Sequence, residues 1–166
     1  MFGDRRGRRS TRLRGYDYSR RGYYFVTIVT ARRDEVFGAV VDGEMRLSVE
    51  GSCVAEVWAS LPRHYPHVSL DAFVVMPNHV HGIVTFGLDP GQGVKRAPLS
   101  EVVRGFKTLA ACRVNGLRGM RGTPVWQRNY YERIIRDDRE LQNVRRYIAE
   151  NPASWDDDDE NPRRPH

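Results

Sequence analysis

Cysteine is scarce in this chain of 166 residues, and the two that occur, Cys53 and Cys112, stand alone in apolar helical patterns. Two isolated cysteines exclude a disulfide framework and a paired-cysteine metal site. We expect buried free thiols, as in a reducing compartment. The chain also lacks an apolar run long enough to span a bilayer, and no apolar core follows its basic start. We therefore expect a cytoplasmic protein without a membrane partner.

Acidic and basic residues are unevenly distributed in this chain, which has a formal net charge of +6. Arginines crowd its start, whereas acidic residues crowd the run 156–160. The rest of the chain is strongly basic, which is the electrostatic footprint of a polyanion binder such as a nucleic-acid-binding protein. A membrane-surface helix is the competing interpretation, but residues 1–14 lack the bulky apolar face it needs. We expect a basic, flexible arm over residues 1–14, one folded domain over residues 15–155, and a disordered acidic tail over residues 156–166.

Two histidines stand inside an otherwise apolar stretch, residues 73–84, which reads FVVMPNHVHGIV. Its β-branched residues and its Pro-Asn pair predict a strand, a tight turn and a second strand. Because side chains alternate between the two faces of a strand, His79 and His81 project from one side while Val80 turns into the core. Two imidazoles that point at one place form half of a divalent-metal site.

The periodicity of the whole chain predicts an α+β fold, an antiparallel sheet with helices on one face, close to the ferredoxin-like plan. The densest run of aromatic and β-branched residues, residues 23–30, is expected to be the central strand. The other expected elements are a hairpin over 37–48, a helix over 49–61 capped by Ser48, a strand over 68–75 paired with the histidine strand, a helix over 99–115 capped by Ser100 and ended by Gly116, short strands within 125–136, and a helix over 137–151.

Tyr147 and Asn151 lie four residues apart in the last predicted helix, so they stack on one helical face. Each has an ordinary interpretation, as a half-buried aromatic and as the helix end before Pro152. Beside two histidines on one strand face, they indicate a more specific chemistry. A tyrosine can attack phosphorus when a bound divalent ion polarises the phosphate. Two imidazoles and a neutral amide oxygen leave coordination positions open for phosphate oxygens and water.

The sequence resembles the REP-associated tyrosine transposases, relatives of the single-tyrosine HUH transposases of bacterial insertion sequences. The similar segments are RLRGYDYS, YYFVTIVT, VVMPNHVHGIV, VVRGFKT, VWQRNYYERIIRD and YIAENPASW, which stand in the family's order over residues 11–155. The resemblance implies the ferredoxin-like fold of the HUH endonucleases. It also implies cleavage and rejoining of single-stranded DNA at hairpin-bearing sites, through a 5′-phosphotyrosine intermediate and with Mg²⁺ or Mn²⁺ as cofactor.

The resemblance also implies roles for particular residues. Tyr147 matches the family's nucleophile, His79 and His81 match its paired metal ligands, and Asn151 matches the amide that completes the metal site. Each of these residues stands in the corresponding segment of this chain.

The implied partner is single-stranded or hairpin DNA, which would make the protein nucleoid-associated. The family grips the hairpin with its basic start, so Arg12 and Arg14 are expected DNA contacts. Lys107 and its neighbour Arg104, on the polar side of the helix 99–115, are expected phosphate contacts. The sequence is compatible with a monomer or a homodimer. It is also compatible with a tyrosine that acts in its own subunit or in that of its partner.

Three alternatives are weighed against this interpretation. Tyr130 and Tyr131 are also candidates for the nucleophile, but neither has an amide partner one helical turn away. A protein that binds hairpin DNA without cutting it would keep the same fold. A zinc hydrolase would need a third protein ligand, for which His64 or His67 would have to join the histidine pair.

Overall fold

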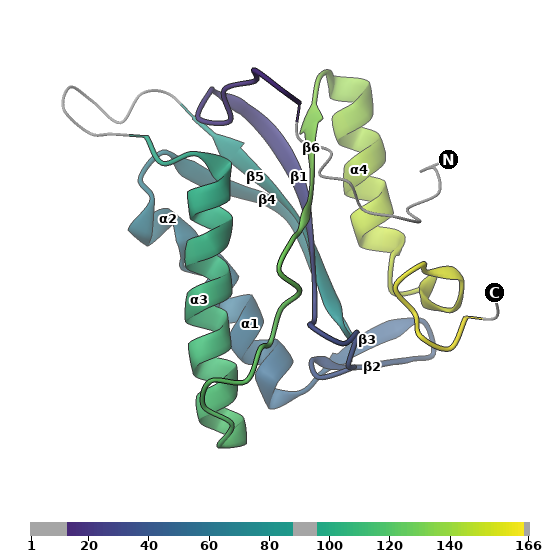
Figure 1. Cartoon of the computed structure of the whole chain (residues 1–166). Coiled ribbons are helices and arrows are strands. Elements are labelled where there is room, and N and C mark those ends of the chain that lie inside the picture. Colours follow the sequence, from purple (N-terminus) through teal and green to yellow (C-terminus); the bar gives the residue numbers. More distant parts are fainter. Residues whose placement is uncertain (1–12, 88–95, 165–166) are drawn as a thin grey trace.

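The computed structural model describes residues 13–87 and 96–164, and its centre is a four-stranded antiparallel sheet (Figure 1). The strands lie in the order β4 (Val68–Met76), β5 (His79–Phe86), β1 (Gly22–Val29) and β6 (Tyr131–Ile135). The prediction that the aromatic and β-branched strand is central is therefore confirmed. Its register with β5 sets Thr27 opposite His81 and Val29 opposite His79.

The predicted hairpin is formed by β2 (Gly38–Val41) and β3 (Glu44–Leu47), which pair in a separate small sheet. Its turn holds Asp42 and Gly43 at φ of 53° and 75°, the left-handed conformation that a two-residue hairpin turn requires at both positions. The chain then enters α1 (Val49–Ala59), where the Ser48 hydroxyl accepts a hydrogen bond from the Gly51 amide at 3.0 Å. Ser48 is thus the N-cap that the sequence predicted.

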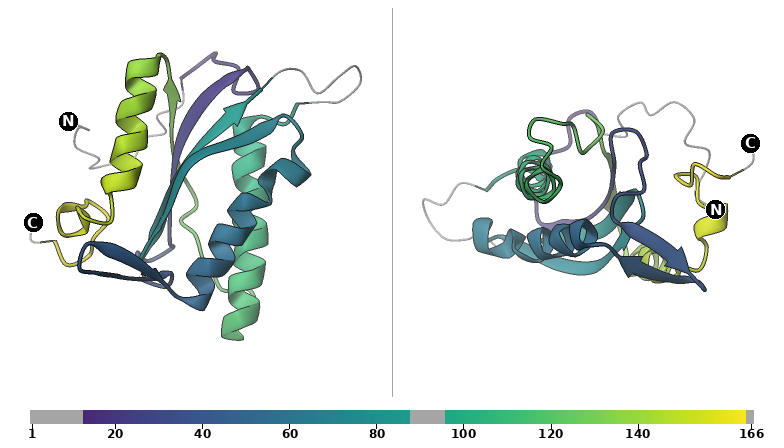
Figure 2. Two further views of the ribbon diagram at one scale, coloured as in Figure 1. Left: turned by 180° about the vertical axis from the view of Figure 1, so that it is seen from behind. Right: turned by 90° about the horizontal axis from the view of Figure 1, so that it is seen from below.

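Helices cover both faces of the main sheet (Figures 1 and 2). On one face α1, the short α2 (Leu61–His64) and α3 (Leu99–Arg118) enclose the larger apolar core. On the other face α4 (Asp138–Glu150) packs against Phe25 of β1 and Ile83 of β5. The antiparallel α+β fold is confirmed, but the expectation of helices on one face is wrong. The reason is that β1 and β5 are buried on both faces, so a helix must cover each face.

The ends of α3 differ from the prediction. Its N-cap is Pro98 rather than Ser100, and the helix continues through Gly116 to a left-handed C-cap at Gly119, where φ is 64°. The Gly119 amide donates to the carbonyl oxygen of Gly116. Gly119, rather than Gly116, therefore ends the helix and supplies a hydrogen-bond donor to its last turn. The single-turn α2 was not predicted, because Pro62 looked like a stop although proline is tolerated in a first turn.

Gly82, beside the second histidine, allows α1 to approach the sheet closely. A Cβ at this position would lie 2.4 Å from Cζ2 of Trp58, whose ring stacks on Phe73 with ring centroids 4.6 Å apart. The strand that carries the histidines is therefore fixed by a tightly packed ring on the face opposite them.

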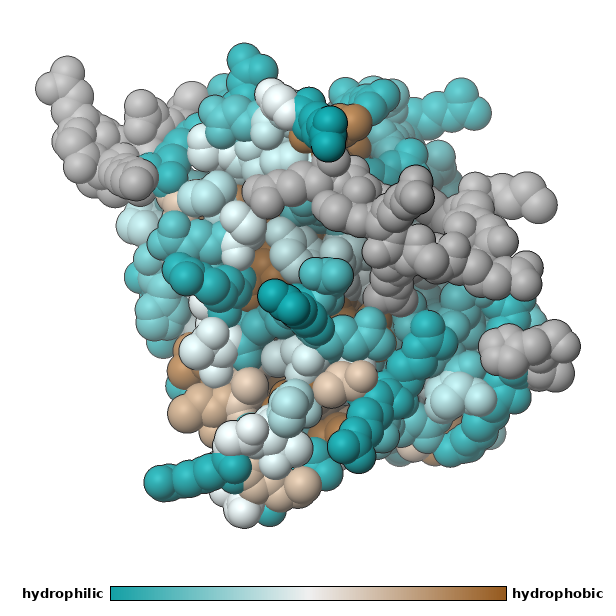
Figure 3. Space-filling view, in the orientation of Figure 1, coloured by the Kyte–Doolittle hydropathy of each residue, from teal (hydrophilic) through white to brown (hydrophobic). Residues whose placement is uncertain are grey.

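The surface of the described residues is mostly hydrophilic on the side shown in Figure 3. Exposed apolar side chains occur near the end of α3, where Leu117 and Met120 are exposed. Both cysteines are free, but Cys53 is only half-buried and Cys112 is exposed, so the expectation of buried thiols is wrong. None of the described helices combines the length and the apolar character that a bilayer span requires.

Candidate active site

The two histidines of β5 converge as the strand alternation predicts. Val80 lies in the larger core, whereas His81 stacks on Phe25 in the direction of α4, with ring centroids 5.5 Å apart. The Nε2 atoms of His79 and His81 are only 3.0 Å apart. Both side chains are almost completely buried, at 0% and 1% exposure. The pair therefore lies inside the molecule, between β5 and α4.

The orientation of the His79 ring is set by Asn78 in the preceding turn. The Asn78 amide nitrogen donates to the carbonyl oxygens of Arg33 at 3.1 Å and Glu160 at 2.7 Å, which turns its Oδ1 toward the histidine. That oxygen lies 2.8 Å from Nδ1 of His79 and can only accept. Nδ1 of His79 therefore carries the proton, and its Nε2 presents a lone pair.

The His81 ring is held in the same way by the neighbouring strand. Its Nδ1 lies 2.8 Å from the hydroxyl of Thr27, a fully buried residue directly opposite on β1. When Thr27 accepts the proton of Nδ1, Nε2 of His81 also presents a lone pair. With both rings in this tautomer, the two Nε2 lone pairs face each other across 3.0 Å, an arrangement that a proton on one ring or a shared cation stabilises.

The helix α4 is anchored at its start and in its middle. Asp137 caps its start by accepting from the Glu140 amide at 2.8 Å. Arg145 donates two hydrogen bonds, of 2.9 and 2.6 Å, to the carboxylate of Asp71 on β4. The Arg145 guanidinium also lowers the pKa of Asp71, because its hydrogen bonds favour the charged carboxylate. This bidentate pair ties the middle of α4 to the sheet.

Tyr147 and Asn151 lie on the face of α4 that points to the histidines. The half-buried Tyr147 ring packs edge-to-face on His81, with ring centroids 5.2 Å apart. Asn151 is 3% exposed at the helix end, and its amide nitrogen donates to Oδ2 of Asp158 at 3.1 Å. Within the described part of the chain, its Oδ1 is buried without a hydrogen-bond partner. The structure thus gathers the tyrosine, the amide and both histidines.

The acidic run after α4 is folded, so the expectation of a disordered tail over residues 156–166 is wrong for the part that the structure describes. A short 3-10 helix, η1 (Trp155–Asp157), turns the chain back toward the hairpin β2–β3 (Figures 1 and 2). Asp158 and Glu160 are buried, at 9% and 1% exposure, while the three acids around them are exposed. The Glu160 carboxylate lies 3.5 Å from Nε of Arg33.

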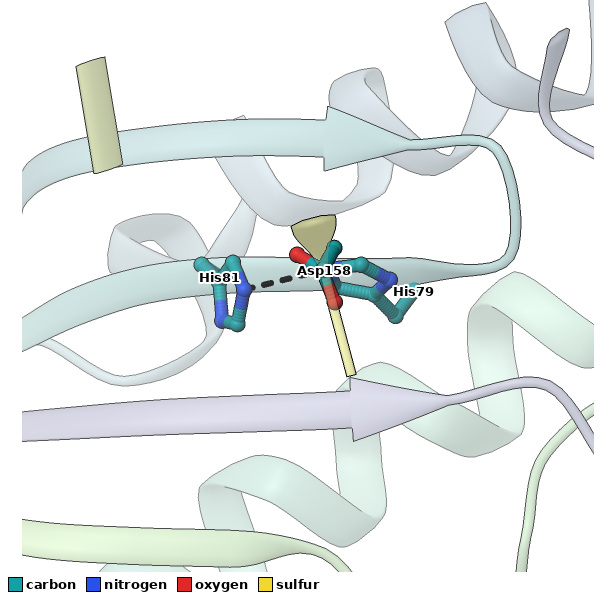
Figure 4. A group of neighbouring side chains, drawn as sticks. All are labelled: His79, His81 and Asp158. Atoms are coloured by element: carbon teal, nitrogen blue, oxygen red, sulfur yellow. Dashed lines mark hydrogen bonds and ion pairs between the residues drawn. The ribbon is translucent and has the colours of Figure 1, made fainter. Parts of the chain in front are cut away.

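Asp158 brings a carboxylate to the histidine pair (Figure 4). Its Oδ2 lies 3.8 Å from Nε2 of His79, and one ligand atom from each of His79, His81 and Asp158 falls within 4.8 Å of the others. Sequence reasoning missed this residue, because five consecutive acids carry no periodic pattern that separates a buried carboxylate from its exposed neighbours. The one signal was Trp155, an aromatic residue just before the run, whose ring lies 6.0 Å from His79.

The alternative third ligands for a zinc site lie elsewhere. His64 is exposed, and His67 is buried with its Nε2 3.0 Å from the carbonyl oxygen of Ala97. The His67 ring packs on Phe86, with centroids 4.8 Å apart, at the end of β5 opposite His79. At about 3.3 Å per strand residue, those ends are about 23 Å apart. A zinc site that combines His67 with the pair is therefore ruled out by distance.

The two other tyrosine candidates have different surroundings. The Tyr130 hydroxyl donates to the carboxylate of Glu132 at 2.8 Å. Tyr131 lies at the start of β6 and packs edge-to-face on Phe25, with ring centroids 6.1 Å apart. Tyr147 is the candidate whose ring lies directly against His81.

The expected DNA contacts are not gathered at this site. Arg12 lies outside the described residues, and Arg14 is exposed near the first described residue. Arg104 is exposed on α3, across the sheet from α4. Lys107 donates to the carbonyl oxygens of Gln127 at 2.8 Å and Arg128 at 3.0 Å, and burial lowers the pKa of its ammonium. Lys107 therefore holds the loop before β6, and its contact with phosphate stays a prediction.

Comparisons with known proteins point to one family. The family model described as "Transposase IS200 like" matches residues 19–151. An uncharacterised protein of Haemophilus influenzae is 35% identical over 91% of each chain. A second protein of that organism, provisionally named a REP-associated tyrosine transposase, is 26% identical over 82% of this chain and 73% of its own.

A solved structure of a REP-associated tyrosine transposase, bound to a REP hairpin, shares the fold. It has a TM-score of 0.61 and 21% identity over 87% of this chain and 74% of its own. The fold and the resemblance expected from the sequence are both confirmed. Since the family model spans most of the sequence, the chain belongs to the IS200-like transposases.

Proposed function

We propose that this protein cuts and rejoins single-stranded DNA at hairpin-bearing sites, with Tyr147 as the nucleophile that forms a 5′-phosphotyrosine intermediate. The observation that carries the proposal is the contact between the Tyr147 ring and His81, whose Nε2 lies 3.0 Å from Nε2 of His79. A tyrosine beside two lone-pair nitrogens is placed to attack a phosphate, and an ion held by those nitrogens would supply the charge that polarises the phosphate. Family membership supports the same chemistry.

The residues present fit a divalent metal ion. His79 and His81 can each offer Nε2, and Asn151 has a buried Oδ1 without a hydrogen-bond partner among the described residues. These three residues are the proposed ligands, and Mg²⁺ or Mn²⁺ is the proposed cofactor. When bound, such an ion would polarise the phosphate and stabilise the negative charge that develops on its oxygens.

The chain itself supplies the nucleophile and the geometry of attack. The phenol oxygen of Tyr147 bonds to phosphorus as its proton is lost to solvent, and the bond from phosphorus to the 3′-oxygen breaks. The leaving 3′-oxygen takes up a proton, while the 5′-phosphate stays on the tyrosine. Attack by a 3′-hydroxyl reverses these steps and rejoins a strand. The bidentate bond of Arg145 to Asp71 fixes the helix that carries the tyrosine.

The proposed chemistry can be performed within one subunit. Tyr147 and both histidines come from a single chain, Tyr147 contacts His81 and His81 contacts His79, so the site does not need a second copy. A homodimer, if it forms, would then serve DNA binding rather than assembly of the site.

Hairpin DNA is the proposed partner, and the solved relative is bound to a REP hairpin. The strongly basic composition supports binding to a polyanion. Arg12, Arg14 and Arg104 remain the proposed contacts, together with Lys107. We expect each lost phosphate contact to lower the salt dependence of single-strand binding by about 0.7 in the log–log slope.

A covalent-adduct assay tests the proposal. Wild-type protein, incubated with Mn²⁺ and a pool of hairpin-bearing single strands, should form a protein–DNA adduct that survives a denaturing gel. Tyr147→Phe should lose the adduct by about 10³-fold or more, because the attacking oxygen is gone while the ring still packs. Tyr130→Phe and Tyr131→Phe are the matched controls and should keep it. DNA binding without any adduct in the wild type would instead favour a hairpin-binding protein that does not cut.

A further inference from the structure

We propose that Asp158 is a further ligand of the divalent ion, supplied by the folded segment that follows α4. The inference rests on the proposed function, because it assigns another residue to the same ion. Asp158 lies 3.8 Å from His79, measured from Oδ2 to Nε2, and ligand atoms of Asp158, His79 and His81 lie within 4.8 Å of one another.

The distances suit one six-coordinate ion. Neighbouring ligand atoms on an octahedral ion with bonds of about 2.1 Å are about 3.0 Å apart. The Nε2 atoms of His79 and His81 already have this separation, 3.0 Å. Oδ2 of Asp158 lies 3.8 Å from Nε2 of His79, less than 1 Å beyond this separation. An ion placed against both nitrogens is thus within reach of Asp158.

Burial favours a charged ligand at this site. His79 and His81 are at most 1% exposed, so an ion between them has lost most of its contact with bulk water. Two imidazoles and the amide of Asn151 are neutral, and an uncompensated divalent charge in a buried site is very costly. The side chain of Asp158, 5% exposed, carries the compensating charge. A carboxylate oxygen is also a ligand that Mg²⁺ and Mn²⁺ favour.

Hydrogen bonds hold this carboxylate in place before any ion arrives. Oδ1 of Asp158 accepts from the Glu160 amide at 2.7 Å, and Oδ2 accepts from the side chain of Asn151 at 3.1 Å. The carbonyl oxygen of Glu160 accepts from Asn78, whose Oδ1 orients His79. One network therefore fixes the proposed ligand and the histidine beside it.

Calorimetric titration of Mn²⁺ into the full-length protein tests the inference without relying on cleavage. We compare the wild type with Asp158→Asn, which keeps the shape of the side chain, and with Asp158→Ala. Asp156→Asn is the matched control, because it removes the same charge from an exposed position of the same acidic run. His81→Ala reports on the histidine site itself. Thermal unfolding without metal verifies that each variant is folded.

Both Asp158 variants should bind Mn²⁺ at least about tenfold more weakly than the wild type, while Asp156→Asn should bind it as the wild type does. Mn²⁺ should also raise the melting temperature of Asp158→Asn less than that of Asp156→Asn. If His81→Ala loses Mn²⁺ and the Asp158 variants keep wild-type affinity, Asp158 is not a ligand and the histidine site stands. If His81→Ala binds Mn²⁺ normally, the metal site of the proposed function itself is wrong.

Discussion

The two faces of the central sheet are built from the same strands, but one face is packed mainly with apolar side chains and the other also carries a group of buried polar side chains. The face under α1 and α3 is an apolar core in which Trp58, Phe106 and Trp126 pack ring against ring. The face under α4 has a much smaller apolar cluster, and next to it stand two histidines, a threonine and an asparagine, all buried. The first face provides packing, while the second combines packing with polar groups.

This difference shows how the fold can accommodate a buried polar site. Buried polar groups are costly unless each finds a partner, and the site under α4 supplies those partners from neighbouring strands and from the segment after the helix. The larger core on the other face supplies the hydrophobic stabilisation. Substitutions on the two faces should therefore separate stability from chemistry.

The largest effect on stability is expected from the core face. Phe106→Ala removes a fully buried ring and leaves a cavity, so the free energy of unfolding should fall by about 3–5 kcal/mol. Adduct formation per folded molecule should stay unchanged, since α3 lies across the sheet from α4, which carries Tyr147. Urea denaturation measures the first quantity and the denaturing gel the second. A Phe106→Ala variant that remains folded but no longer forms the adduct would show that the core face also contributes to the chemistry.

On the face under α4, Thr27→Val should weaken metal binding strongly and lower the free energy of unfolding only a little. The variant keeps the shape of the side chain but removes the hydroxyl that orients His81, so Mn²⁺ affinity should fall by about 10–100-fold. The free energy of unfolding should fall by only about 1–3 kcal/mol, because one buried donor loses its partner. Thr30→Val is the control, since its hydroxyl bonds to the Asp34 carbonyl oxygen instead. Equal Mn²⁺ affinities of the two variants would show that Thr27 has no role at the site.

Much of this arrangement could be predicted from local spacing. Strand alternation predicted the convergence of His79 and His81, and the helical repeat predicted that Tyr147 and Asn151 share a face. Asp158 could not be predicted, because its place depends on a contact with His79, which lies far from it in the sequence. The same holds for Thr27, whose role follows from the register between β1 and β5 rather than from its own neighbours. The packing of α4 on the second face of the sheet was not predicted, because the sequences of the strands do not indicate which helix packs on which face.

The smallest effect is expected from the ion pair that anchors α4. The folded pKa of Asp71 is lowered by Arg145, so the pair adds stability above the unfolded value of about 3.9 and loses it as the pH falls through the folded pKa. Because the Arg145 side chain is 37% exposed, solvent screening limits the contribution to about 1 kcal/mol or less. Melting temperatures of Asp71→Asn and the wild type should differ at neutral pH and converge in acid. A difference that is constant across this range would mean that the charge of Asp71 contributes nothing.

The identity of the DNA-linked tyrosine tests the central claim most directly. Trypsin separates the candidates, because Tyr147 is the one tyrosine in the peptide 147–163, whereas Tyr130 and Tyr131 share the peptide 129–133. Mass spectrometry of the nuclease-trimmed adduct should find a nucleotide phosphate on the peptide 147–163. The same modification on the peptide 129–133 would contradict the account, because the nucleophile would then lie outside the contact between α4 and His81.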